Sequence, residues 1–432
     1  MGLLRQVSAM IAARWGGYVL EGVASILVAR YTGPAGKGIL AVLNVLSGFA
    51  IQMGNLGLHA ATAYFAAREA EALSRIAWTS LLLAPAIVIV MSAAFGVGIG
   101  IFPASLPSIP TLFIAISLLS IPLALVIMFF QNILLGQQRI GAYILLDVGG
   151  KALALPLIIL ILVFLQGGVR ELLIAGLCLM SATAILAVRL AFQGVTTRFA
   201  FDHALLRRML AYGLRSYLSC VFAYLILRSD MLLVNYFLGS AQAGIYAVAV
   251  NLADLLLVFP TAVGTLLFPR ISSRVTDDGI LTAAVSRHTA AGMLLLCAGA
   301  WECAHPLIVL LFGRAFHDAA IPFLLLLPGI LALSLEIVFM NDLAGRGLPP
   351  VVIAVPGIGL VINLALNVAL LPHFGLNAAA ISSSVAYSVM LVIAWKAFAR
   401  RTVTSARTCY LITHADVQAL FARLLEICRR NR

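Results

Sequence analysis

Long apolar runs, separated by short polar gaps, make up most of the chain. A membrane-spanning helix needs about 20 mainly apolar residues, and twelve runs are close to that length. They lie at residues 8–30, 39–66, 76–102, 111–135, 143–165, 171–193, 209–238, 244–269, 289–311, 321–344, 350–372 and 376–395. Because lipid offers no hydrogen-bond partners, each run must bond its backbone groups internally, as an α-helix does. The pattern therefore predicts an all-α, polytopic membrane protein with twelve transmembrane helices.

The composition agrees with this prediction. Of the 432 residues, 63% are apolar and 10% are charged, whereas soluble domains have about 25% charged residues. The formal net charge of +12 would suggest nucleic-acid binding in a soluble protein. Here, however, the basic residues lie mostly in the gaps between apolar runs, where they can face anionic lipid headgroups. The charge therefore indicates contact with a membrane surface.

The basic residues also predict the orientation of the chain. Nineteen Lys and Arg residues fall in one set of alternate gaps and in the C-terminal tail. The other set of gaps holds four, namely Arg30, Lys37, Arg170 and Arg314. Loops rich in Lys and Arg remain on the cytoplasmic side. Both termini are therefore predicted to be cytoplasmic, and the four residues of the second set are predicted to lie in outside loops.

An internal repeat suggests how the helices are grouped. Residues 33–42 (GPAGKGILAV) align without gaps on residues 239–248 (GSAQAGIYAV), with six identities. An even number of spans separates the two copies, so the halves have the same topology, as in parallel-repeat transporters. We expect two six-helix lobes, 1–197 and 198–399, with a substrate route between them. The basic tail, 400–432, has an amphipathic pattern typical of an interfacial helix. The glycines alone are better explained as tight turns between helices.

Ionisable residues within the apolar runs are the candidate functional groups, because each costs about 2.5–3.5 kcal/mol to insert at the bilayer centre. The candidate substrate-binding residues are the cations Arg14, Lys151 and Arg228 and the aromatic residues Tyr217 and Tyr224. The candidate coupling residues or counter-ions are the acids Glu21, Asp230 and Asp254. These eight residues constitute the predicted site.

Structural explanations exist for several intramembrane residues. Asp147 and Lys151 are four residues apart and can neutralise each other on one helix. Asp342 lies near a cytoplasmic helix end and can extend to the interface. Tyr217, Tyr224 and Arg228 share one helical stripe, which suits either a sugar and phosphate path or aromatic packing.

Motifs of catalysis and metal binding are not found. The chain contains neither HExxH nor GxSxG, and its His and Cys residues lack metal-ligand spacing. The six cysteines are scattered and suggest no disulfide framework. We therefore expect a protein that is not an enzyme and that has no metal and no cofactor.

Four segments resemble a known family of transporters. Residues 27–67, 227–272, 306–330 and 363–391 are similar to the oligosaccharide flippases of bacterial polysaccharide biosynthesis. These flippases belong to the multidrug, oligosaccharidyl-lipid and polysaccharide exporter superfamily. The most specific element is the Arg-Ser-Asp sequence at 228–230, followed by Leu-Gly-x4-Gly-x-Tyr.

This resemblance implies a function. Such proteins export a lipid-linked oligosaccharide, usually on undecaprenyl pyrophosphate, from the inner to the outer leaflet of the bacterial inner membrane by alternating access. Glycosyltransferases and a polysaccharide polymerase of the same pathway are implied as partners. H+, Na+ and the membrane potential remain open as the driving force. Related lipid II flippases carry basic residues in a central cavity, which Arg14 and Arg228 match in kind. A drug/cation antiporter of the same superfamily and a non-transporting membrane assembly scaffold are the alternatives.

Overall fold

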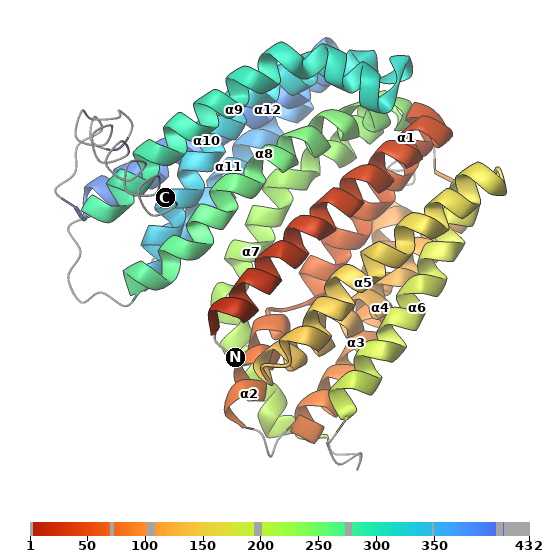
Figure 1. Cartoon of the computed structure of the whole chain (residues 1–432), viewed down its shortest axis with the longest axis vertical. Helices are drawn as coiled ribbons and strands as arrows, with labels where there is room; N and C mark the ends of the chain where they lie inside the picture. Colours follow the sequence, from red (N-terminus) through yellow and green to blue (C-terminus); the bar gives the residue numbers. More distant parts are fainter. Residues whose placement is uncertain are drawn as a thin grey trace, which may run out of the picture. The chain divides into compact units, whose positions relative to one another are not determined.

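The structure is a computed structural model that describes residues 3–69, 73–101, 109–193, 201–272, 279–347, 350–402 and 409 (Figure 1). Within these ranges the regular elements are helices and no strand occurs. The chain forms two compact units, Met1–Val248 with Ile308–Asp318, and Ala249–Leu307 with Ala319–Arg432. The predicted lobe boundary near residue 198 stays a prediction. The amphipathic part of the tail lies outside the described residues.

Helices α1 to α7 belong to the first unit. Their bounds are α1 Leu3–Gly54, α2 Leu58–Arg68, α3 Leu73–Ile101, α4 Thr111–Gly136, α5 Ile140–Ile159, α6 Val169–Phe192 and α7 His203–Leu238. A π-helical segment, η3 (Leu160–Phe164), extends α5.

Helix α8 (Ser240–Ser272) begins in the first unit and continues into the second. The remaining elements are α9 Ile280–Phe312, η4 Arg314–Ala319, α10 Ala320–Gly345, α11 Pro350–Phe374 and α12 Leu376–Ala399. The end of α9 belongs to the first unit, where the Arg30 guanidinium donates a hydrogen bond to the Leu311 carbonyl oxygen at 2.7 Å.

The helices confirm an all-α membrane protein. Ten stretches of the described helices are long and apolar enough to cross a membrane. One of them, Trp15–Gly54, has 40 residues and would be about 60 Å long as a single helix, about twice the hydrocarbon thickness. Its backbone leaves the helical conformation at Gly33 (φ 66°, ψ −175°), which divides it into two crossings. The described apolar part of α3, Leu73–Ile87, is shorter, so the count of twelve stays a prediction.

The two copies of the repeat contact each other reciprocally. Gly33 and Gly239 have nearly the same backbone conformation (φ 66° and 85°, ψ −175° and 172°), which glycine adopts without steric cost. A Cβ at Gly38 would overlap the carbonyl oxygen of Ser240, and a Cβ at Gly244 would overlap that of Pro34. Pro34 and Ser240 occupy equivalent repeat positions. The first glycine of each copy therefore turns the chain, and the second lets the backbones touch.

Lys37 is not in an outside loop. The prediction was wrong because helix α1 resumes directly after the Gly33 turn, so Lys37 is helical and buried. Its ammonium donates a hydrogen bond to the Ser25 hydroxyl oxygen at 2.8 Å. The side chain thus bridges the two crossings of α1.

The predicted span at residues 39–66 is also interrupted. Helix α1 ends at Gly54, and Leu56 and Gly57 have positive φ angles of 49° and 73°. At this break the chain lies directly against α7, because a Cβ on Gly57 would overlap the Gly213 carbonyl oxygen. Helix α2 is therefore a separate short helix packed against α7.

Polar contacts connect the beginning of α7 with the end of α2 and the beginning of α3. Asp202 caps α7 by accepting a hydrogen bond from the Leu205 amide at 3.0 Å and pairs with Arg75 at 2.9 Å. Hydrogen bonds from the backbone amides of Leu205 and Ala204, and then the Arg75 contact, lower the pKa of the Asp202 carboxyl. Arg208 makes two hydrogen bonds to the Glu69 carboxylate, at 2.9 and 3.2 Å. These bonds hold the first turns of α7 within the first unit.

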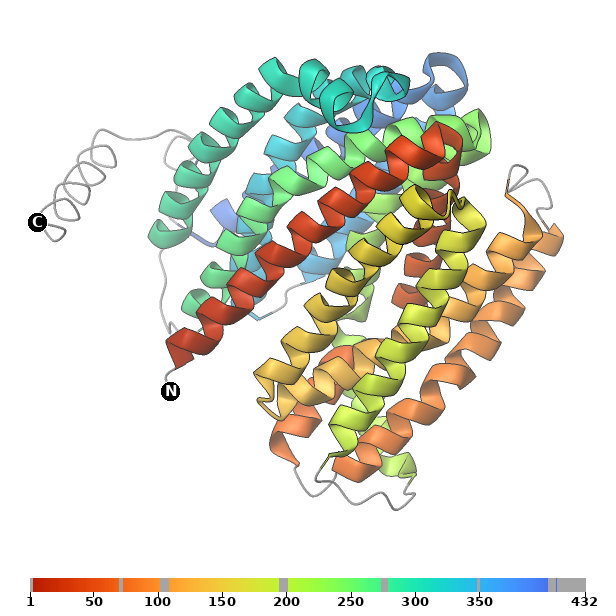
Figure 2. The ribbon, with the colours of Figure 1, turned by 45° about the vertical axis from the view of Figure 1, so that its right-hand side comes forward.

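The core of the first unit lies around α4. Phe129, Phe130 and Ile133 are fully buried on this helix. They belong to a cluster that also includes residues of α2, α3, α6 and α7. Figure 2 shows α4, α5 and α6 side by side, in agreement with their contacts.

In the second unit, Asp342 does not extend to the interface. The prediction was wrong because the carboxylate is fully buried (0% exposed) and bonded within the protein. It accepts hydrogen bonds from Arg346 Nε at 2.7 Å and from the Thr282 hydroxyl at 2.7 Å. Since Thr282 is on α9, the carboxylate connects the beginning of α9 to the end of α10.

Candidate functional site

Three predicted intramembrane residues meet in the first unit. The Lys151 ammonium on α5 lies 3.2 Å from a Glu21 carboxylate oxygen on α1 and 3.6 Å from an Asp147 oxygen one turn away. The Lys151 side chain passes α1 at Gly17. A Cβ on Gly17 would stand 3.4 Å from the Cδ and Nζ atoms of Lys151. We call Glu21, Asp147 and Lys151 the charge triad. One cation lies between two anions, so the triad carries a net charge of about −1.

The position of the triad determines what it can contact. Glu21 is near the middle of an apolar run, yet its side chain is 54% exposed. A carboxylate facing hydrocarbon is costly, so exposed acids in spans face a water-filled cavity or the bundle interior. The triad therefore indicates a hydrated face of the first unit between α1 and α5.

Tyr217 and Tyr224 lie between α7 and the second crossing of α1. The Tyr217 hydroxyl donates a hydrogen bond to the Met53 carbonyl oxygen, and that of Tyr224 bonds to Val45 at 3.3 Å. A Cβ at Gly48 would overlap the Tyr224 hydroxyl. Both phenols thus pack α7 against α1, which favours the packing explanation of this stripe.

The two candidate arginines differ in what the structure describes. Arg228 is half-buried on α7, one turn beyond Tyr224. The backbone of Arg14 is part of α1, but its side chain lies outside the described residues. A common phosphate site of Arg14 and Arg228 therefore stays a prediction.

Asp230 is a buried structural group. Its carboxylate accepts a hydrogen bond from the Tyr246 hydroxyl at 2.6 Å and one from the Met231 amide at 2.8 Å. Tyr246 is fully buried. The pair bridges α7 and the beginning of α8, as Lys37 and Ser25 bridge the two crossings of α1. Asp254 lies further along α8, in the second unit, and is half-buried.

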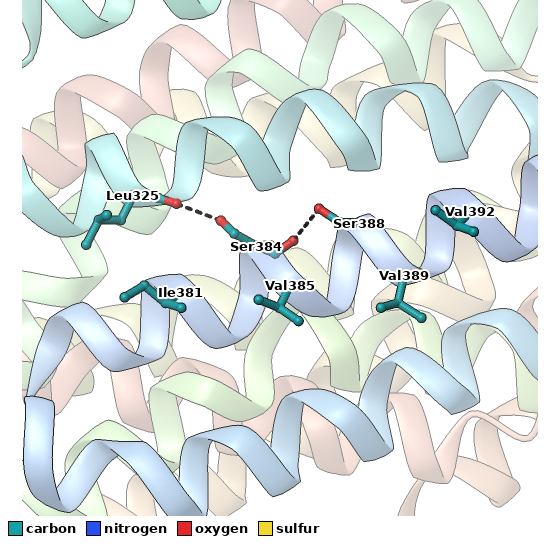
Figure 3. A pocket seen from close by; sticks show the side chains of 7 residues that line it. All are labelled: Leu325, Ile381, Ser384, Val385, Ser388, Val389 and Val392. Carbon is teal, nitrogen blue, oxygen red and sulfur yellow. Dashed lines mark hydrogen bonds between the residues drawn. The ribbon is translucent and has the colours of Figure 1, made fainter. Parts of the chain in front are cut away.

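A groove in the second unit is chemically different. It follows α12 beside α10, and its lining includes Val385, Val389 and Val392 (Figure 3). Its Ser384 and Ser388 hydroxyls donate hydrogen bonds to the Leu325 and Ser384 carbonyl oxygens, at 2.6 and 2.7 Å. The lining contains no charged group. The groove therefore suits an apolar chain better than a sugar or phosphate.

Sequence reasoning found the Asp147 and Lys151 pair but missed the third member of the triad. Glu21 and Lys151 are far apart in the sequence, and no periodic pattern connects them. The burial of Lys37 and the Tyr246 contact were missed for the same reason. The Asp342 and Arg346 pair did have a signal, because the two residues are four positions apart on one helix.

Comparisons with known proteins agree with the resemblance. The chain matches the family described as "Polysaccharide biosynthesis protein" over residues 3–275. The probable low-salt glycan biosynthesis flippase Agl15 of Haloferax volcanii is 25% identical over 192 residues, covering 43% of this chain and 41% of that protein. The probable flippase AglR of the same organism is 28% identical over 186 residues, covering 40% and 38%. The match thus spans about two fifths of the length of these relatives.

Solved structures share the fold. The lipid II flippase MurJ in an inward closed conformation has a TM-score of 0.74 at 12% identity, covering 91% of this chain and 89% of that chain. An inward-facing multidrug resistance transporter of the MATE family has a TM-score of 0.70 at 15% identity, covering 90% and 96%. These identities are low, so the likeness concerns the fold. The family match extends over more than half of the sequence, and the chain belongs to the polysaccharide biosynthesis protein family.

Proposed function

We propose that the chain is a flippase that moves a lipid-linked oligosaccharide from the inner to the outer membrane leaflet by alternating access. The family match over residues 3–275 is the observation that carries this proposal. It is supported by two partial relatives named as probable flippases, one of them in glycan biosynthesis. The carrier proposed here is undecaprenyl pyrophosphate, and the product serves surface polysaccharide assembly.

The proposed chemistry separates the head group from its lipid tail. Arg228 and Arg14 attract the pyrophosphate, because the planar guanidinium forms bidentate hydrogen bonds with phosphate oxygens. The prenyl chain remains in lipid. A membrane potential supplies about 2.3 kcal/mol per charge per 100 mV, which favours exit of an anionic head group from a negative interior. Exchange of H+ or Na+ at Glu21 or Asp254 is the alternative driving force for transport.

The proposed location is a bacterial inner membrane, with both termini cytoplasmic. Glycosyltransferases that supply the substrate and a polymerase that consumes it are the proposed partners.

Labelling of single cysteines tests this orientation. We expect Arg314→Cys, at an exposed site in η4, to react with an impermeant maleimide in intact cells. Ala67→Cys, at an exposed site near the end of α2, should react only after permeabilisation. The background lacks the six native cysteines. Reaction of Ala67→Cys in intact cells would contradict the proposed orientation.

Transport in vesicles tests the function itself. The purified chain is reconstituted with undecaprenyl pyrophosphate carrying a fluorescent disaccharide, and external dithionite bleaches only the outer leaflet. We expect the protected fluorescence to fall relative to protein-free vesicles. Arg228→Ala should weaken substrate affinity about ten- to a hundred-fold, because one charge-assisted contact contributes about 1.5–3 kcal/mol. Arg228→Lys should lose less, since it keeps the charge.

The control is Arg189→Ala, which removes an exposed arginine from the last turn of α6 and should transport normally. A protected fraction equal to that of empty vesicles would contradict the flippase and favour a non-transporting scaffold. Wild-type transport by Arg228→Ala would exclude this arginine from substrate binding.

The net negative triad favours a second candidate, a drug/cation antiporter, because an acidic site attracts cations. In that case the same vesicles would accumulate tetraphenylphosphonium in exchange for protons when a proton gradient is imposed. The lipid-linked sugar would not move.

A further inference from the structure

The charge triad is poorly suited to bind phosphate. The Lys151 ammonium has three N–H donors and lies within 3.6 Å of both carboxylates. An incoming anion would compete with these partners and would meet a net negative charge. A neutral, hydroxyl-rich group meets no such repulsion, because carboxylate oxygens accept hydrogen bonds from hydroxyls.

An exposed aromatic side chain, Tyr18, lies on the same part of α1 as the triad. Tyr18 is 41% exposed. Tyr18 precedes Glu21 by three residues, so the two share a helical face. An aromatic face carries a negative quadrupole and a large apolar surface, which suits the C–H face of a sugar ring.

Gly22 leaves room beside this aromatic surface. It lies one turn after Tyr18, and no atom is within 4 Å of the place where its Cβ would stand. Helical side chains point back towards the N-terminus, so a side chain at position 22 would extend over the turn that contains Tyr18. Glycine therefore keeps the Tyr18 ring uncovered beside the carboxylates.

We propose that Tyr18, Glu21 and Asp147 form a subsite for one pyranose ring of the oligosaccharide head group. Gly22 has no side chain and so leaves room for the sugar ring beside Tyr18. The Tyr18 ring stacks on the C–H face, and the two carboxylates accept hydrogen bonds from ring hydroxyls. Lys151 is a positioning residue that fixes both carboxylates. This subsite rests on the proposed flippase function and separates sugar recognition at Tyr18, Glu21 and Asp147 from pyrophosphate binding at Arg14 and Arg228.

The test compares two lipids that differ only in their sugar. The full chain in nanodiscs is titrated with undecaprenyl pyrophosphate carrying a disaccharide and with bare undecaprenyl pyrophosphate, and binding is measured by native mass spectrometry. Tyr18→Ala and Glu21→Gln should weaken binding of the glycosylated lipid about tenfold or more and leave binding of the bare lipid unchanged. Tyr18→Phe keeps the ring and should bind normally.

Further variants separate this role from a structural one. Gly22→Leu should reduce only glycosylated-lipid binding, because its side chain covers the Tyr18 ring. Lys151→Met should lower the preference for the glycosylated lipid, and Lys151→Arg should restore it. Val19→Ala is the matched control, because Val19 is exposed on the opposite side of α1 from Glu21. It should bind both lipids as the wild type does.

Several results would overturn the subsite. Equal losses of binding affinity for the two lipids would assign the triad to the pyrophosphate. Unchanged binding of both lipids by Tyr18→Ala and Glu21→Gln would show that this face does not contact the substrate. Glu21-dependent binding of tetraphenylphosphonium would make it a cation site. If the wild type flips both lipids but does not distinguish them, the subsite fails and the flippase remains. If it flips neither, the proposed function fails too.

Discussion

Gly38→Ala and Gly244→Ala should each prevent the first unit from reaching its native packing. Either new Cβ would overlap a backbone carbonyl oxygen of the opposite turn. A backbone group cannot rotate away as a flexible side chain can, so the helices must separate. Overpacking by extra methylenes already costs about 1–3 kcal/mol where side chains can adjust. We expect a larger loss here, seen as aggregated protein on size-exclusion chromatography after detergent extraction.

Gly16→Ala and Gly299→Ala are the matched controls, because each new Cβ would meet no atom within 4 Å. Both should elute as the wild type does. Since the two repeat turns contact each other reciprocally, the two destabilising variants should behave alike. A native elution profile and melting temperature for Gly38→Ala would contradict the backbone contact between the turns.

Asp342→Ala should strongly destabilise the second unit. The substitution removes a fully buried carboxylate that faces Arg346 and Thr282. Removing one partner of a buried ion pair typically costs about 3–5 kcal/mol, and the lower part of this range is expected here because the Arg346 side chain is 18% exposed. The melting temperature in detergent should fall markedly.

Asp318→Ala is the comparison for this change, since it removes an exposed carboxylate that pairs with His317 at 3.0 Å. Solvent-exposed pairs contribute little, so the melting temperature should stay near the wild-type value. Similar melting temperatures for Asp342→Ala and the wild type would show that the Asp342 pair does not stabilise the unit.

The apolar runs predicted most helices of this fold because lipid imposes a single local rule. Each span must satisfy its own backbone hydrogen bonds, and this requirement is visible in any stretch of about 20 residues. Where the helices deviate, the cause is tertiary. The break at Leu56 and Gly57 accompanies the close approach of Gly213 on another helix, which the local pattern of residues 39–66 does not contain.

The candidate site was less predictable for the same reason. Asp147 and Lys151 are one turn apart, so their pairing follows from helical geometry. The Glu21 contact depends on how α1 and α5 pack, and the sequence alone does not specify that register. Tyr217 illustrates the opposite case, because its helical stripe was visible, but its partner, the Met53 carbonyl, was not.

The contact between the repeat turns also determines when the first unit can be completed during synthesis. The backbone at Gly38, just after the Gly33 turn, touches a segment that begins at Ser240, about 200 residues later. At about 5–20 residues per second, the ribosome needs roughly 10–40 s to make that stretch. Until then the close-packing surface at Gly38 has no partner within its own chain. A nascent protein that stalls before α8 therefore presents an incomplete first unit to membrane quality control.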